Sequence, residues 1–246
     1  MTHSDVTVPT GDGEAGATLH APPGAGRAPG VLMFTDAAGV RQTFVAMADR
    51  LAAAGYWVLV PDYYHRTPFE PFDPATVFAD PDERARLSRL ASGLTTPMIV
   101  RDTGAYLRFL AAVPMVSGDG LGTTGYCMGG RFSLLAAVHH PDLVAAAASF
   151  HGGNLAAADD PDSPALTADR IRAGVYVAAA ENDASFPADQ YARLAGAFAA
   201  AGVRATLETY PAAHGFAVPD NTTHDAAAEE RHWLALLKLY GDHLTG

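Results

Sequence analysis

The stretch LGTTGYCMGGRF, from Leu121 to Phe132, decides the fold. An apolar run enters it, a helix-forming run leaves it, and between them stands Cys127, the one cysteine of the 246-residue chain. Gly125 and Gly129 lie two residues before and after this cysteine, in the pattern Gly-x-Cys-x-Gly. A strand that turns sharply into a helix has no room for side chains at those two positions, so glycine is needed there. The pattern predicts a strained turn that lifts the Cys127 sulfur above a sheet, at a helix N-terminus that favours a thiolate.

A lone cysteine has a second interpretation. Free cysteines are among the most buried residue types, so Cys127 could be an ordinary core residue. The glycines on both sides of it, directly after an apolar run, favour a catalytic residue instead. Because one cysteine cannot form an internal disulfide, and the N-terminal MTHSDVTVPTGDGEAG has no secretory signal, we expect a reducing, cytoplasmic location.

Length and composition restrict the class of protein. With 246 residues, 49% of them hydrophobic, the chain is long enough for one α/β domain over residues 1–246 with a large core. The formal net charge of −11 and the lack of a concentrated basic face argue against nucleic acid as a partner. The sequence has no apolar run of the ~18 residues that a membrane-spanning helix needs. We expect a monomer or weak homodimer that acts on a small molecule, without a membrane partner.

The apolar pattern changes period repeatedly along the chain. Runs that resemble buried strands lie at 31–35, 56–60, 121–126, 144–150, 174–180 and 203–210, and the runs at 6–8 and 17–20 flank glycines as in a hairpin. Alanine- and leucine-rich runs with helical spacing lie at 42–54, 99–112, 130–139, 188–201 and 223–239. This alternation predicts a mostly parallel sheet with helices on both faces and an N-terminal antiparallel hairpin.

Two segments do not fit the alternation. Residues 63–97 begin with four prolines within 19 residues (Pro68, Pro71, Pro74 and Pro81), which are too many for a long helix at the start of the segment. Residues 154–167 are rich in Asp and Pro, and we expect a surface loop there. Long excursions after strands build the walls of binding crevices in α/β sheets, so we expect 63–97 to form such a wall, with Phe69, Phe72 and Phe78 as its apolar surface.

A nucleophile at such a turn needs a general base, and the base needs a carboxylate that orients it. Glu181 and Asp183 follow one predicted strand, and His214 follows the last one. These loops leave the same edge of the sheet as Cys127, because parallel strands share their carboxyl ends. We expect Cys127, His214 and Asp183 to act together. Asp183 is preferred to Glu181 because a short acid suits the turn before a helix.

Each of these assignments has a purely structural alternative. Asp183 could cap the helix that is predicted to begin near Pro187, and His214 could be one more surface histidine. Seven other histidines are expected to be solvated: His3, His20, His65, His139, His140, His224 and His232. Their spacing is not that of a metal site, so we predict no metal ion.

Several ordered motifs resemble the dienelactone hydrolase family of α/β-hydrolases. They are DAAGV at 36–40, PDYY at 61–64, GYCMGG at 125–130, END at 181–183 and AHGF at 213–216. The resemblance covers nearly the whole chain, and it implies hydrolysis of an ester or lactone by Cys127, His214 and Asp183, through a thioester and without a cofactor. Two backbone N–H groups would hold the oxyanion, that of Met128 and, by the resemblance, that of Ala37.

The resemblance also points to two substrate-side residues. Asp36 stands where the family has a glutamate that contacts the resting thiol, but an acid that closes the turn is the alternative. Arg86 stands where the family has one of two arginines that hold a substrate carboxylate. The second arginine position is Val218 here, and Arg86 could simply lie on a solvated helix face. The resemblance therefore favours a broader ester or lactone substrate over dienelactone itself.

Two other functions are open to a chain of this pattern. A cysteine-dependent amidotransferase would need a His-x-Glu sequence, whereas Gly215 and Phe216 follow His214. A non-catalytic binding module would keep the pocket but lose a member of the triad, and all three residue types are present.

Overall fold

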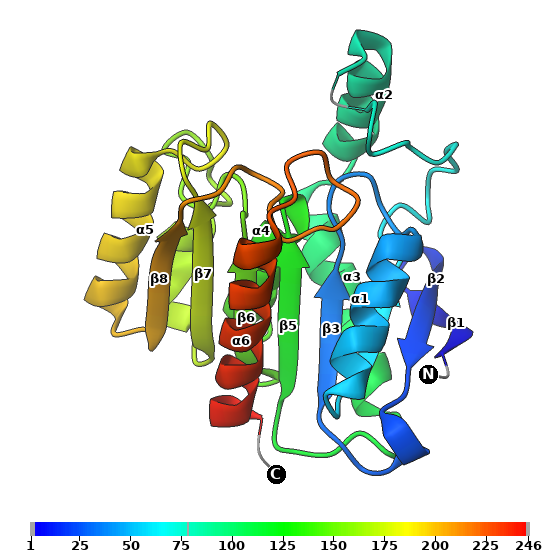
Figure 1. Cartoon of the computed structure of the whole chain (residues 1–246). Coiled ribbons are helices and arrows are strands. Elements are labelled where there is room, and N and C mark those ends of the chain that lie inside the picture. Colours follow the sequence, from blue (N-terminus) through cyan, green and yellow to red (C-terminus); the bar gives the residue numbers. More distant parts are fainter. Residues whose placement is uncertain (1–2, 78, 245–246) are drawn as a thin grey trace.

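The computed structural model describes residues 3–77 and 79–244, and an eight-stranded sheet forms its centre (Figure 1). The strands are β1 (His3–Thr10), β2 (Gly13–His20), β3 (Gly30–Phe34), β4 (Trp57–Pro61), β5 (Leu121–Tyr126), β6 (Val144–Phe150), β7 (Gly174–Ala180) and β8 (Ala205–Tyr210). Their order is β1-β2-β4-β3-β5-β6-β7-β8. β1 pairs antiparallel with β2, and β2 pairs antiparallel with β4. The six strands from β4 onward in this order, including β3, are parallel to one another.

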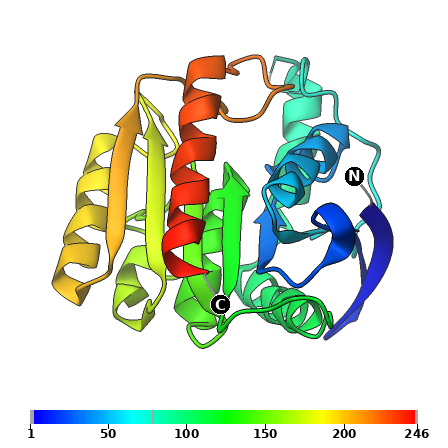
Figure 2. The same ribbon diagram turned by 60° about the horizontal axis from the view of Figure 1, so that its bottom comes forward.

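Helices cover both faces of the sheet (Figures 1 and 2). The α-helices are α1 (Gln42–Ala53), α2 (Pro81–Ser92), α3 (Thr96–Ala111), α4 (Met128–His139), α5 (Ala188–Ala201) and α6 (Ala226–His243). α1 and α6 pack on one face, and α3, α4 and α5 pack on the other. The α/β-hydrolase architecture and the N-terminal hairpin are confirmed, and β5, β6 and β7 occupy the predicted residues.

The central strands are buried on both faces, which explains why they do not alternate between apolar and polar residues. In β3, Val31 and Met33 belong to the core beneath α1 and α6, whereas Leu32 and Phe34 belong to the core beneath α3 and α4. All five residues of β3 are buried. The carboxyl ends of the parallel strands therefore meet at one edge, where polar residues can collect without disturbing either core.

The excursion at 63–97 contains helix α2 and ends at the start of α3; α2 stands away from the sheet on the side of the carboxyl ends (Figure 1). Asp80 caps this helix by accepting the N–H groups of Asp82 and Glu83. Phe72 and Leu87 are buried in a small separate cluster that includes Ala38, in the loop after β3. The excursion is thus anchored on that loop, and Phe78 lies outside the described residues.

Three local predictions were wrong. Residues 154–167 are not simply a surface loop, because Leu155 and Ala156 are fully buried and a 3-10 helix begins at Pro164. His20 and His232 are also fully buried rather than solvated. Both nitrogens of each ring have hydrogen-bond partners, which allows a neutral imidazole to leave water. Burial lowers the pKa of His232 to about 3.

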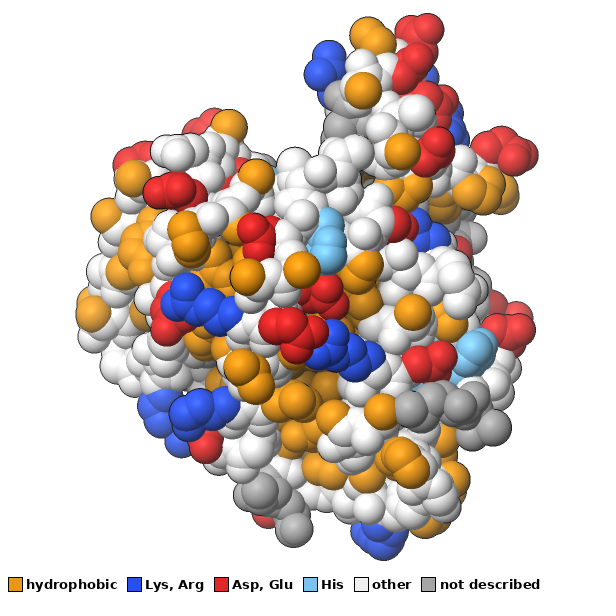
Figure 3. Space-filling view, in the orientation of Figure 1, with side chains coloured by type: hydrophobic (Ala, Val, Ile, Leu, Met, Phe, Trp, Pro, Cys, Tyr) orange, Lys and Arg blue, Asp and Glu red, His pale blue; other side chains and the backbone are white. Residues whose placement is uncertain are grey.

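On the face shown in Figure 3, basic side chains are dispersed among acidic ones. Within the described parts of the chain, no helix is both long and apolar enough to span a bilayer.

Arg66 joins three segments that are distant in sequence. Its Nη1 and Nη2 donate to the two carboxylate oxygens of Asp102 in α3, at 2.6 and 2.8 Å. Its Nε also donates to Asp12, in the turn between β1 and β2, at 3.0 Å. The Asp102 side chain is only 1% exposed, so its negative charge depends on this partner.

We therefore expect Arg66→Met to lower the free energy of unfolding by about 3 kcal/mol, because it removes both hydrogen bonds that Arg66 makes to the buried Asp102 carboxylate and leaves it only the longer contact with Arg101, at 3.8 Å. Urea unfolding followed by circular dichroism measures the change. The matched control is Arg172→Met, which removes an exposed ion pair with Asp142 and should leave the midpoint nearly unchanged. Equal effects of the two substitutions would contradict the prediction.

Candidate active site

Cys127 lies at the turn between β5 and α4, with its side chain partly exposed. Its backbone is left-handed, with φ 54° and ψ −119°, a strained conformation for a residue with a side chain. A Cβ atom at Gly125 would collide with the carbonyl oxygen of Gly129, and one at Gly129 would collide with that of Thr35. The glycines therefore permit the close packing that keeps the sulfur at the N-terminus of α4.

His214 and Asp183 meet in the loops that follow β8 and β7. His214 Nδ1 lies 2.6 Å from Asp183 Oδ2. Asp183 Oδ1 accepts the N–H and the hydroxyl of Ser185, at 2.8 and 2.6 Å, which fixes the orientation of the carboxylate. Asp183 is 7% exposed, whereas Glu181 is exposed to solvent. Geometry thus pairs the imidazole with Asp183 rather than with Glu181.

The charge state of His214 follows from its two partners. Burial alone would lower the pKa of this imidazole, but hydrogen bonds to Asp183 and to Cys127 outweigh burial and raise the pKa to about 10. For Asp183, burial raises the pKa, and the hydrogen bond to His214 more than reverses this, so that the pKa is lowered. An imidazolium between a carboxylate and a sulfur is therefore the favoured state at neutral pH.

The turn after β3 brings Asp36 and Ala37 to the same edge. Tyr63 Oη–H donates to the carbonyl of Asp36, and Tyr64 Oη–H donates to the carbonyl of Ala37 at 2.9 Å. Asp36 Oδ1 accepts the N–H of Ala38 at 3.0 Å. Among the described residues, the N–H of Ala37 makes no hydrogen bond. The carbonyl groups of Asp36 and Ala37 are therefore both hydrogen-bonded, while the N–H of Ala37 remains available.

Arg41 occupies both carboxylate oxygens of Asp36, at 2.7 and 2.8 Å. The same guanidinium also binds Asp220, in the loop that follows His214, at 2.7 and 2.8 Å. Burial disfavours the charge of Arg41, but the two ion pairs outweigh burial and raise its pKa. The Asp36 carboxylate is thus committed to Arg41, which links the turn after β3 to the loop that carries His214.

Arg86 lies on α2 with its guanidinium already engaged. The group stacks 3.8 Å from the centroid of the Phe72 ring, and it donates to the Glu83 carboxylate and to the carbonyl of Glu70. Val218, where the family's second arginine was expected, is fully buried. The two positions together offer no unpaired cation among the described residues.

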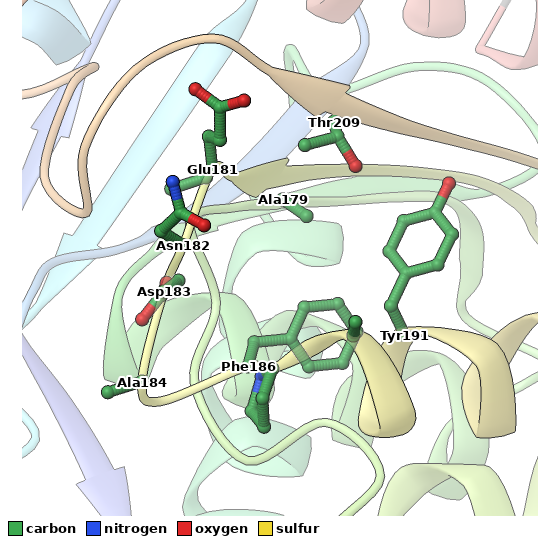
Figure 4. A pocket seen from close by; sticks show the side chains of 11 residues that line it. Ala179, Glu181, Asn182, Asp183, Ala184, Phe186, Tyr191 and Thr209 are labelled. Carbon is green, nitrogen blue, oxygen red and sulfur yellow. The ribbon is translucent and has the colours of Figure 1, made fainter.

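Two cavities involve residues near the proposed site or in the excursion at 63–97. One of about 440 Å³ lies behind the acid loop, where Phe186 and Tyr191 face it (Figure 4). Its lining includes Asp183 but neither Cys127 nor His214, so it is not the space above the sulfur. The other, of about 570 Å³, lies against α2 and is lined by Phe69, Arg86 and Leu90 among others.

Sequence reasoning missed His151, which directly follows β6. Its side chain is 1% exposed, and its Nδ1 accepts the backbone N–H of Cys127 at 3.2 Å. Its ring centroid lies 5.1 Å from that of His214, in an edge-on arrangement. Burial and the neighbouring His214 lower the pKa of His151 well below its usual value. His151 directly follows β6, a buried strand that pairs with β5, the strand before Cys127. That position is the sequence signal that could have identified it.

This chain is similar to a family of known proteins over most of its length. The profile of the family described as "Dienelactone hydrolase family" matches residues 16–244. An Escherichia coli K12 protein named "Putative carboxymethylenebutenolidase" is 28% identical over 222 residues, which cover 87% of this chain and 77% of that protein.

Two solved structures share the fold over nearly their whole length. A structure described as "Putative Dienelactone Hydrolase", from Klebsiella pneumoniae, has a TM-score of 0.84 at 23% identity and covers 98% of this chain and 99% of its own. A dienelactone hydrolase-like promiscuous phosphotriesterase from metagenomic libraries has a TM-score of 0.80 at 24% identity and covers 99% of both chains. The family match extends over most of the sequence, so this chain belongs to the dienelactone hydrolase family of hydrolases.

Proposed function

We propose that this chain hydrolyses carboxylic esters or lactones through a thioester, with Cys127 as nucleophile, His214 as general base and Asp183 as the acid that orients it. One observation supports the proposal: His214 Nδ1 lies 2.6 Å from Asp183 Oδ2, and this pair comes from turns after β7 and β8, at the same edge of the sheet as the turn after β5 that carries Cys127. A structural role alone would not require a partly exposed sulfur at that edge.

Acylation starts from the ion pair in which the Cys127 proton already lies on His214, so that a thiolate faces an imidazolium. The sulfur attacks the carbonyl carbon, and the carbonyl π electrons move to oxygen. The N–H groups of Ala37 and Met128 are proposed to hold this oxyanion, because both lie beside the turn that carries the sulfur. The oxyanion then collapses, the C–O bond to the alcohol breaks, and His214 gives its proton to the departing oxygen.

Deacylation repeats the sequence with water. Neutral His214 takes a proton from a water molecule, the hydroxide attacks the thioester, and the carboxylic acid leaves as sulfur recovers its electron pair. Asp183 stabilises the imidazolium in each half-reaction without accepting the proton. The residues named here account for every proton transfer in the scheme.

The substrate is proposed to need no free carboxylate. Arg86 is paired with Glu83 and stacked on Phe72, and the second arginine position holds a buried valine. Binding of a carboxylate by Arg86 would require breaking contacts that the arginine already makes. This favours a neutral ester or lactone, with the aromatic side of the excursion as an apolar wall.

Alkylation of Cys127 with iodoacetamide should abolish hydrolysis of p-nitrophenyl acetate, because the chain has one thiol and the scheme has no other nucleophile. Release of p-nitrophenol, measured against the extent of alkylation by mass spectrometry, tests this. Activity that survives complete alkylation would refute the role of Cys127.

Two histidine variants, one at His214 and a control at His224, test the assignment of the general base. His214→Ala should slow turnover at least ~100-fold, which is the usual contribution of a general base. His224→Ala, which removes a histidine paired with Glu229, should retain the wild-type rate. Equal rates for both variants would rule out the assignment of His214.

The pH dependence should reveal the ion pair around His214. Because its pKa is raised to about 10, the imidazolium persists as pH rises, and kcat/KM for an ester of an alkyl alcohol should fall only near pH 10. Asp183→Asn removes the charge that opposes burial, so this decline should move toward neutral pH. Titration of the released acid over pH 6–11 measures both profiles. A decline in kcat/KM at the same pH in Asp183→Asn as in the unsubstituted protein would contradict the proposed effect of Asp183 on the pKa of His214.

Arg86→Ala should change kcat/KM for lactones with and without a free carboxylate by the same factor, within about twofold, because the guanidinium is already paired. Arg89→Ala, at the border of the same cavity, is the matched control. A loss of more than about tenfold that is confined to the charged lactone, and to Arg86→Ala, would show that Arg86 binds the carboxylate.

A further inference from the structure

A cluster at the N-terminal edge of the sheet has no part in the proposed hydrolysis. His3 begins β1, His20 ends β2, and the two lie directly opposite one another in the antiparallel register. Asp49 reaches the same point from α1. His20 also pairs with Val58, near the start of β4, so the cluster lies at the end of the sheet opposite to Cys127.

Three potential metal ligands converge at this point. One ligand atom from each of His3, His20 and Asp49 lies within 4.8 Å of the other two. Asp49 Oδ1 is 2.8 Å from His20 Nδ1 and 3.6 Å from His3 Nδ1. In a tetrahedral site with metal–ligand bonds of ~2.0–2.2 Å, neighbouring ligand atoms are about 3.3–3.6 Å apart. The two separations from Asp49 lie below and at the end of this range, and the ligand nitrogens of the two histidines lie within 4.8 Å of one another, so side-chain movements would bring the three atoms to this spacing.

The surroundings of His20 also suit a ligand. Its second nitrogen, Nε2, lies 2.9 Å from Thr18 Oγ1, the kind of contact that fixes the ring orientation of metal-binding histidines. The His20 side chain is fully buried, whereas those of His3 and Asp49 are 39% and 29% exposed. Three protein ligands would thus face a side that is open to solvent, where water can complete the coordination.

We propose that His3, His20 and Asp49 bind one divalent transition-metal ion of the Zn²⁺ class. Two imidazoles and one carboxylate form a donor set that such ions accept. On binding, the neutral His20 ring changes tautomer: its single proton moves from Nδ1 to Nε2 by exchange with solvent, Nδ1 forms the metal bond, and Nε2–H donates to Thr18 Oγ1. Because β1 pairs on one side only, the ion would tie this edge strand and β2 to α1. It would therefore stabilise the folded state by mass action.

Metal titration of the full-length protein tests the site, with Cys127 first alkylated so that its thiol cannot bind the ion. Calorimetry with Zn²⁺ should give one ion per chain, and Co²⁺ should give visible absorption bands of a site with nitrogen and oxygen ligands. At a free Zn²⁺ concentration of ~100 Kd, Tm should rise by roughly 5–10 °C.

Point variants decide whether this cluster is responsible. His3→Ala and Asp49→Asn alter partly exposed side chains, and each should weaken binding at least about tenfold and remove the increase in Tm. His224→Ala, which removes a histidine bonded to one carboxylate, should bind Zn²⁺ as the unsubstituted chain does. The absence of saturable one-to-one binding, or undiminished binding in His3→Ala, would overturn the proposal.

Discussion

The close approach of three backbone segments beneath Cys127 is the constraint on which the site depends. The end of β5, the first turn of α4 and the loop after β3 come so near one another that a Cβ atom on Gly125 or Gly129 would collide with a neighbouring carbonyl. Cys127 has its left-handed conformation at this point, and Gly129 lies against the carbonyl of Thr35, two residues before Ala37. The proposed nucleophile and one proposed oxyanion donor are thus positioned by the same packing.

Arg41 extends this frame to the loop that carries His214. One guanidinium holds Asp36, directly before Ala37, and Asp220, in the loop that carries His214. The arginine side chain is mostly buried, so both ion pairs are shielded from solvent more than surface pairs are. A movement of either loop would have to break a charge-assisted hydrogen bond, and the two sides of the proposed cleft are therefore mechanically connected.

The sequence predicted features that local pattern determines. β5, β6 and β7 match because buried parallel strands are continuous apolar runs, and the glycine frame identified the Cys127 turn. The hydrogen-bond partners of Asp36 and Arg86 could not be predicted from the sequence. They depend on how separate segments of the chain pack together, and no sequence motif links those segments. Burial of His20 and His232 was missed for the same reason, since a neutral imidazole can be buried wherever the fold supplies two hydrogen-bond partners.

Two histidines lie next to Cys127, and their environments move their pKa values in opposite directions. His214 contacts the Asp183 carboxylate, so its charged form is favoured although burial opposes it. His151, with its ring 5.1 Å from that of His214, has no such carboxylate, and burial keeps it neutral. A second imidazolium there would repel the first and weaken the pairing of His214 with sulfur. A neutral His151 can instead accept the N–H of Cys127, so it supports the turn without competing for the proton.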